Sequence, residues 1–127
     1  LKNTFKDSRI RFVKASFKKQ TINNLRYFSH LYFHGHTVGG TNPSLLEAMG
    51  CKCVICAHDN PFNREVLEED GNYFLDVNDV VNAVDPLERN SVQQQKIKNN
   101  LEKLKTRYNW DIVAEQYEVV FQQALIR

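Results

Sequence analysis

The chain has 127 residues, of which 42% are hydrophobic and 25% are charged, and its formal net charge is +2 at pH 7. This length fits one globular domain with its own core, and so small a net charge points to no particular partner class and gives no sign of a nucleic-acid partner. The sequence contains no apolar run long enough to span a membrane and no signal-peptide pattern.

Positive charge is concentrated in the first twenty residues. They contain one acidic residue, Asp7, and these basic residues: Lys2, Lys6, Arg9, Arg11, Lys14, Lys18 and Lys19. A solvated face is the simpler interpretation of this segment, and contact with phosphates or with an anionic membrane surface is the alternative.

Hydrophobic periodicity predicts strands and helices that alternate along the chain. Strands are expected at residues 9–15, 30–34, 53–58 and 72–77. Helices are expected at residues 18–29, 42–49, 60–69, 79–87 and 91–108, and from residue 110 to the end. This order predicts an α/β fold, a Rossmann-like parallel sheet flanked by helices on both faces. Because a complete doubly wound domain often has about six strands, we expect one or two further βα units ahead of Leu1.

The three cysteines, Cys51, Cys53 and Cys56, lie in one apolar run that resembles a buried strand. Alternation along a strand would place Cys51 and Cys53 on one face and Cys56 on the other, so the three thiols are not expected to share a metal ion. We expect reduced thiols in the core of a cytoplasmic protein.

A glycine turn followed by a helix start occupies residues 34–50, HGHTVGGTNPSLLEAMG. Gly39 and Gly40 allow the backbone to bend and to bring bare amides close to a ligand. Asn42 is a suitable N-cap, and Pro43 then falls at the first helical position. The turn follows a predicted strand, at the edge where parallel sheets bind ligands, and such a helix start suits a phosphate.

An acidic residue, Glu47, follows one turn into the same helix. A carboxylate a little beyond contact distance from a phosphate can accept hydrogen bonds from sugar hydroxyls, so the combination suits a nucleotide. An ordinary loop and cap with a solvent-exposed Glu47 is the alternative. His34 and His36 face the same way, but the sequence offers no third ligand, so no metal site is predicted and at least one histidine is expected to be structural.

The segment from Tyr32 to Phe74, YFHGHTVGGTNPSLLEAMGCKCVICAHDNPFNREVLEEDGNYF, closely resembles the donor-binding C-terminal domain of family 4 glycosyltransferases. These are retaining enzymes with the two-domain GT-B architecture. The chain is most similar to a rhamnosyltransferase-like subgroup of bacterial polysaccharide synthesis, in which HGH-x-VGGTNPSLLEAM and DNPFNREVL recur. QTINNLRYFS and YNWDIVAEQYEVVF resemble the same subgroup, so the likeness covers most of the chain from about Arg9.

The resemblance implies roles for individual residues. Two glutamates with seven residues between them flank the glycine turn in the family, and Glu47 matches the second, which contacts the ribose. Gly39 stands where the first would contact the transferred sugar, and His36 or Asn42 is the expected substitute. Basic residues that clamp the diphosphate in the family have no evident counterpart. The implied nucleotide-sugar-binding residues are Gly39, Gly40, Thr41, Asn42, Pro43 and Glu47, with His36 as a further donor-sugar contact.

The implied activity is transfer of a sugar, with retention, from a nucleotide-diphospho-sugar to a glycan or lipid-linked acceptor. The resemblance places this step in bacterial surface polysaccharide synthesis (O-antigen or capsule), in the cytoplasm or at the inner face of the plasma membrane. No cofactor is expected, because a helix dipole and backbone amides can stabilise the leaving diphosphate. Residues 1–127 would form the nucleotide-sugar-binding domain, in whole or in part, and would be inactive without the N-terminal domain.

Two other classes of function are compatible with the sequence. One is a non-catalytic module that kept the fold and binds a nucleotide or a partner. The other is a different nucleotide-sugar enzyme such as an epimerase, which is less favoured because the nicotinamide-binding fingerprint is absent.

The last predicted helix, within residues 109–127, carries two apolar faces. The broad face is expected to dock on its own domain and comprises Trp110, Val113, Tyr117, Val120, Phe121, Ala124 and Leu125. Ile112, Val119 and Ile126 form a row on nearly the opposite side. We expect this row to contact the N-terminal domain and to be exposed in the present chain.

Overall fold

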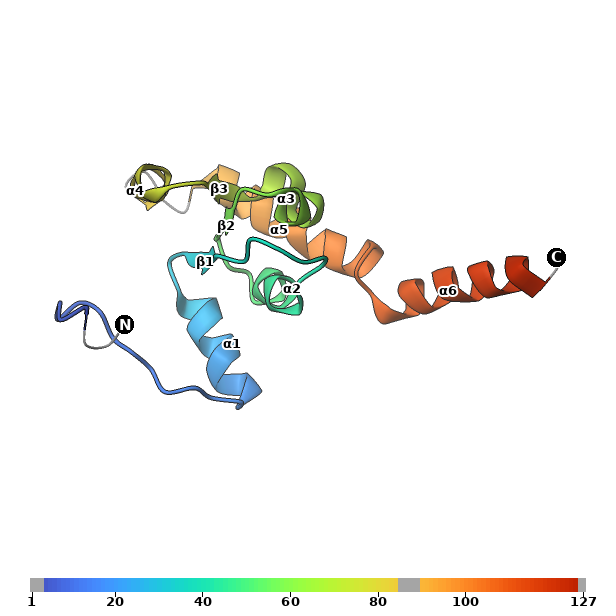
Figure 1. Ribbon diagram of the computed structural model, residues 1–127, viewed down its shortest axis with the longest axis horizontal. Coiled ribbons are helices and arrows are strands. Elements are labelled where there is room, and N and C mark those ends of the chain that lie inside the picture. The colour runs from blue at the N-terminus through green and yellow to red at the C-terminus, as the bar shows by residue number, and fades with distance from the viewer. Residues whose placement is uncertain (1–3, 85–89, 126–127) are drawn as a thin grey trace.

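Three short parallel strands form the sheet of the computed structural model, which describes residues 4–84 and 90–125 (Figure 1). The strands are β1 (Tyr32–His34), β2 (Ile55–His58) and β3 (Asn72–Phe74), and they lie in the order β1-β2-β3. Tyr32 pairs with Ile55, and Cys56 pairs with Asn72. The prediction of an α/β fold with a parallel sheet is confirmed.

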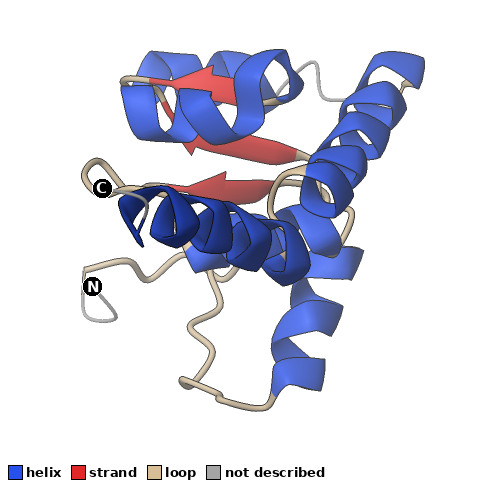
Figure 2. Ribbon diagram, turned by 90° about the vertical axis from the view of Figure 1, so that its right-hand side faces the viewer, coloured by secondary structure: helices blue, strands red, loops and turns tan. Residues whose placement is uncertain are grey.

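Helices flank this sheet, and Figure 2 shows them around the three strands. They are α1 (Lys19–Phe28), α2 (Pro43–Gly50), α3 (Pro61–Leu67), α4 (Val77–Val84), α5 (Ser91–Thr106) and α6 (Trp110–Leu125), with a short 3-10 turn at Glu68–Asp70. The helix predicted at residues 79–87 therefore begins two residues earlier, and its last three residues lie outside the described part of the chain. No helix in the described residues is long and apolar enough to cross a membrane.

The core lies between β2 and the two helices that flank it in sequence. Its fully buried hydrophobic side chains come from α2, from α3 and from β2 with the residues before it: Leu45, Ala48, Met49, Cys53, Ile55, Ala57, Val66 and Leu67. Leu104 and Tyr108, near the end of α5, pack against this cluster, and Ile97 of α5 contacts Val54. Burial of this apolar surface fixes α2 and α3 relative to the sheet, and so fixes the loops that precede them.

The strand predicted at residues 9–15 is wrong, because this segment has no regular secondary structure. Ile10, Phe12 and Val13 are exposed. An alternating pattern gives only a local preference, and a strand becomes stable only when another strand pairs with its backbone. No described strand pairs with residues 9–15, so the predicted set of four strands is reduced to three.

The assignment of Cys51 to a strand is also wrong. Cys51 follows directly after α2, and Lys52, with φ of 60°, turns the chain toward β2. The predicted core position is confirmed for Cys53 and Cys56, and none of the three cysteines forms a disulfide bond. Burial raises the pKa of Cys56 to about 11, so its thiol stays protonated near neutral pH.

The prediction that the broad apolar face of α6 docks on its own domain is wrong. Figure 1 shows α6 running away from the sheet, and Trp110 and Leu125 are 84% and 85% exposed. The end of α5 already covers the core. In the opposite row, the predicted exposure of Val119 is confirmed, whereas that of Ile112 is not, because its side chain is half-buried. Ile126 lies outside the described residues.

Candidate functional site

The glycine turn lies at the carboxyl ends of β1 and β2, where the sequence places it. The turn residues His36, Gly39, Gly40 and Asn42 line a narrow pocket together with the start of α3. From α3 and its cap, the pocket receives Asn60, Phe62 and Asn63. Two βα loops therefore meet at one edge of the sheet, as expected for a ligand site in a parallel α/β fold.

The conformation of the turn depends on one glycine. Gly39 has φ of +120°, a region that residues with a side chain rarely adopt, and no atom lies within 4 Å of a Cβ built at this position. The constraint is thus the backbone conformation and not the available space. A glutamate at position 39, where the resemblance would place one, would be strained in this turn.

The helix start has the predicted caps. The Asn42 side-chain oxygen accepts a hydrogen bond from the Ser44 amide at 2.9 Å, and Pro43 is the first residue of α2. The amides of Gly40 and Thr41 have no hydrogen-bond partner in the described part of the chain. They remain available to an anion in front of the positive end of the α2 dipole.

Two asparagines hold the turn in place, and sequence reasoning did not single them out. The side-chain amides of Asn60 and Asn63 both donate to the backbone carbonyl of His36, at 2.9 and 3.1 Å. Asn63, which is 4% exposed, also donates to the carbonyl of His58 at 2.8 Å. The DNPFN motif was the available signal, but it does not reveal that the acceptor lies 24 residues upstream.

His34 and His36 point the same way, as predicted, and their rings stack at a centroid distance of 4.8 Å. His34 is buried, and neither ring nitrogen has a hydrogen-bond partner among the residues described. Burial lowers the pKa of His34, and the nearby His36 lowers it further, so the ring is neutral near pH 7. Among the described residues, no group of histidine, cysteine or acidic side chains could hold a metal ion.

Glu47 lies on the other side of the helix start and forms an ion pair that sequence reasoning missed. Arg26 of α1 donates from Nη1 to Glu47 Oε2 at 2.7 Å. The Arg26 side chain is 10% exposed, whereas that of Glu47 is 51% exposed. An isolated arginine near the end of α1 was the only signal for this contact.

The predicted site residues are thus divided between two hollows. His36, Gly39, Gly40 and Asn42 line the narrow pocket, whereas Thr41, Pro43 and Glu47 border a larger and mainly apolar one of about 410 Å³. Tyr108 and Asn109 from the junction between α5 and α6, Trp110 and Val113 from α6, and Leu46 from α2 complete the lining of the larger hollow. The first turn of α2 separates the two hollows, so one extended ligand would have to lie across it.

Comparison of the chain with protein-family models, with curated proteins and with solved structures found no match.

Proposed function

We propose that the chain is the donor-binding domain of a retaining GT-B glycosyltransferase, related to the rhamnosyltransferase-like subgroup of family 4. The observation that carries the proposal is the glycine turn before α2. It combines the amides of Gly40 and Thr41, which have no partner in the described part of the chain, with the half-exposed carboxylate of Glu47, and Thr41 and Glu47 border the same hollow. This arrangement suits a nucleotide-diphospho-sugar, whose diphosphate joins a sugar to a ribose.

In the proposed reaction, the bond between the anomeric carbon and the diphosphate oxygen breaks, and the diphosphate leaves with the electron pair. The amides of Gly40 and Thr41 and the dipole of α2 stabilise the charge that develops on the leaving group. The acceptor hydroxyl forms the new bond on the same face of the sugar and passes its proton to the leaving diphosphate oxygen. His36, which is exposed at the narrow pocket, is the proposed contact to the transferred sugar.

The acceptor is a glycan or a lipid-linked glycan, held mainly by an N-terminal domain, in bacterial surface polysaccharide synthesis on the cytoplasmic side of the membrane. A GT-B active site is a cleft between two domains, so we expect the isolated chain to transfer no sugar. A radiolabelled-donor assay that found normal turnover by the isolated chain would contradict this part of the proposal.

Calorimetric titration with UDP, GDP, ADP and dTDP tests the nucleotide site. At least one of these should bind, and Glu47→Ala should weaken its binding by about 1–3 kcal/mol, the scale of hydrogen bonds to a charged group. Glu115→Ala, which removes an exposed carboxylate from α6, is the matched control and should change nothing. Unchanged affinity in Glu47→Ala would make Glu47 an ordinary surface residue of the helix.

One observation favours a second candidate, a non-catalytic nucleotide-binding module. Gly39 occupies the position of the sugar-contacting glutamate of the family, and its backbone disfavours any side chain there. Such a module would bind the nucleoside diphosphate and depend on Glu47, but would not transfer sugar even together with its N-terminal domain. The radiolabelled-donor assay on the two-domain protein separates the two candidates.

A further inference from the structure

The Arg26 side chain is only 10% exposed, and the described polar contacts of its guanidinium converge on the first turns of α2 and on β1. Besides the ion pair with Glu47, Nη2 contacts Ser44 Oγ at 3.4 Å, and the guanidinium lies 5.8 Å from the centroid of the Tyr32 ring. The Tyr32 hydroxyl forms a hydrogen bond with Ser44 Oγ at 2.9 Å. Burying an arginine is costly unless its charge is paired, so this arrangement differs from a surface ion pair.

The pair constrains Glu47 without covering it. Oε2 of Glu47 receives the hydrogen bond from Arg26, whereas Oε1 has no partner among the described residues, and the side chain is half exposed. A free glutamate samples many rotamers, and fixing one carboxylate oxygen removes most of that freedom. The positive charge of Arg26 also offsets the repulsion that Glu47 would exert on a nearby diphosphate.

We propose that Arg26 is a positioning residue for ribose recognition: it orients Glu47 so that the free carboxylate oxygen accepts from the ribose hydroxyls. This inference rests on the proposed nucleotide site. A purely structural role, in which Arg26 only ties α1 to α2, is the competing explanation. The two differ in whether the effect of Arg26 depends on the ribose hydroxyls.

The test compares UDP, GDP and ADP with their 2′,3′-dideoxy counterparts in calorimetric titrations of this chain. The wild-type chain should prefer the ribose form. Arg26→Met should weaken binding of the ribose form roughly tenfold, the scale of one hydrogen bond to a charged group, and should change binding of the dideoxy form by less than about twofold. In a Glu47→Gln background, Arg26→Met should have no further effect on the ratio of the two affinities.

Arg64→Met is the matched control, because it breaks an arginine–carboxylate pair, Arg64–Asp59, that lies outside the first turns of α2. It should leave the ratio of ribose to dideoxy affinity unchanged. Arg26→Lys keeps the charge but loses the planar fork, and its ratio should lie between wild type and Arg26→Met. If Arg26→Met does not fold, the ratio of Arg26→Lys decides, and a wild-type ratio overturns the inference.

Two other results would overturn the inference in distinguishable ways. If Arg26→Met weakens both nucleotide forms equally, Arg26 has only a structural role, and the proposed nucleotide site still stands. If the wild-type chain binds both forms equally, or binds none of them, the ribose contact of Glu47 fails and the inference fails with it.

Discussion

His34 combines deep burial with two ring nitrogens that lack hydrogen-bond partners in the described part of the chain. An unsatisfied polar group in a core lowers the free energy of unfolding. A protein that keeps such a group usually does so for another reason, such as function. The neutral ring supports His36 by stacking and so helps to shape the narrow pocket.

The lowered pKa of His34 predicts a pH dependence of folding. The native state keeps His34 neutral, whereas the unfolded state takes up a proton near the ordinary value of 6.5. The free energy of unfolding should therefore fall as the pH drops below that value. His34→Phe should reduce the loss between pH 7.5 and 5.5 in urea denaturation. His30→Phe, at an exposed histidine, is the control, and an equal loss in wild type and His34→Phe would contradict the prediction.

The turn offers a matched pair of glycines for a second prediction. Gly39→Ala should destabilise the protein by about 1–2 kcal/mol, because a side chain is strained at φ of +120°. Gly40→Ala should cost less, since Gly40 lacks a positive φ and also has open space around it. Chemical denaturation of the two variants measures the difference. Equal costs would mean that the turn relaxes and does not depend on the conformation of Gly39.

At the scale of elements, Asn63 joins the β1–α2 loop to the start of α3. Asn63→Ala should cost about 1–3 kcal/mol, because it removes the hydrogen bonds to the carbonyls of His36 and His58 in a buried place. Asn24→Ala, in the exposed part of α1, should change stability by less than about 0.5 kcal/mol. Thermal and urea unfolding of both variants check the prediction. Similar results for the two asparagines would show that the loops are not held by this bridge.

Elements with local signals could be predicted from the sequence, and elements that depend on distant partners could not. The N-cap at Asn42, the proline after it and the alternation of β1, α2, β2 and α3 follow from neighbouring residues. Among the described residues, no strand pairs with residues 9–15 despite their strand pattern, and the apolar face of α6 stays largely exposed.

The candidate site, too, could be predicted only where its features depend on neighbouring residues. The glycine turn and Glu47 are local features, and the structure places them at the expected edge of the sheet. Arg26 lies 21 residues before Glu47, and Asn60 lies 24 residues after His36, so no periodicity could pair them. The division of the site into two hollows likewise depends on the direction in which the chain turns from α5 into α6.

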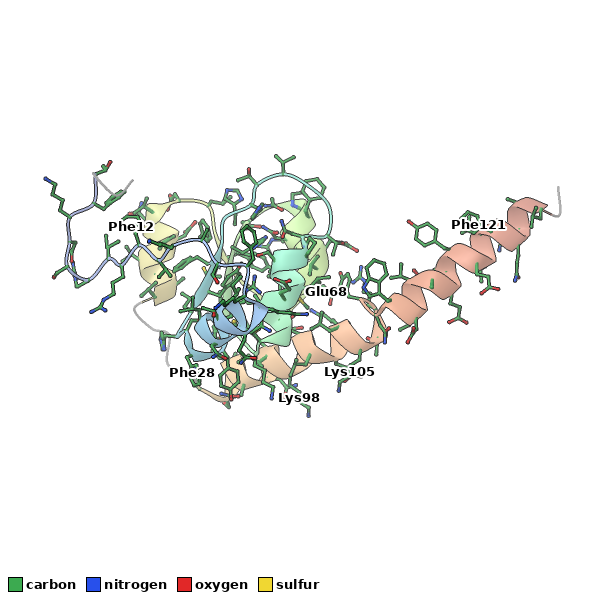
Figure 3. The ribbon with its side chains drawn as sticks, turned by 90° about the horizontal axis from the view of Figure 1, so that it is seen from below. Phe12, Phe28, Glu68, Lys98, Lys105 and Phe121 are labelled. Carbon is green, nitrogen blue, oxygen red and sulfur yellow. The ribbon has the colours of Figure 1, made fainter. Side chains whose placement is uncertain are left out.

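At the scale of the whole molecule, α6 projects from the domain, and Figure 3 shows Phe12 and Phe121 toward opposite ends of the protein. Tyr117 and Phe121 are each 63% exposed. The double variant Tyr117→Ser/Phe121→Ser should reduce self-association in sedimentation velocity, because exposed apolar faces associate. Its free energy of unfolding should stay within about 0.5 kcal/mol of wild type.

The control for α6 is Leu67→Ser, at a fully buried position, which should unfold the core. A loss of several kcal/mol in the α6 double variant would show that this helix packs on the domain in solution. The predicted contact of Ile112, Val119 and Ile126 with an N-terminal domain stays a prediction, to be tested by their protection in the two-domain protein.

The most direct test of the central claim is an NMR titration of the ¹⁵N-labelled chain with the nucleoside diphosphate that binds best. The amides from Gly39 to Glu47, except at Pro43, should shift most, with a smaller response from Asn60 and Asn63. The amides of Lys98 and Lys105 on α5 should not respond. Shifts confined to the basic segment before α1, or no shifts at saturating nucleotide, would contradict a nucleotide site at the start of α2.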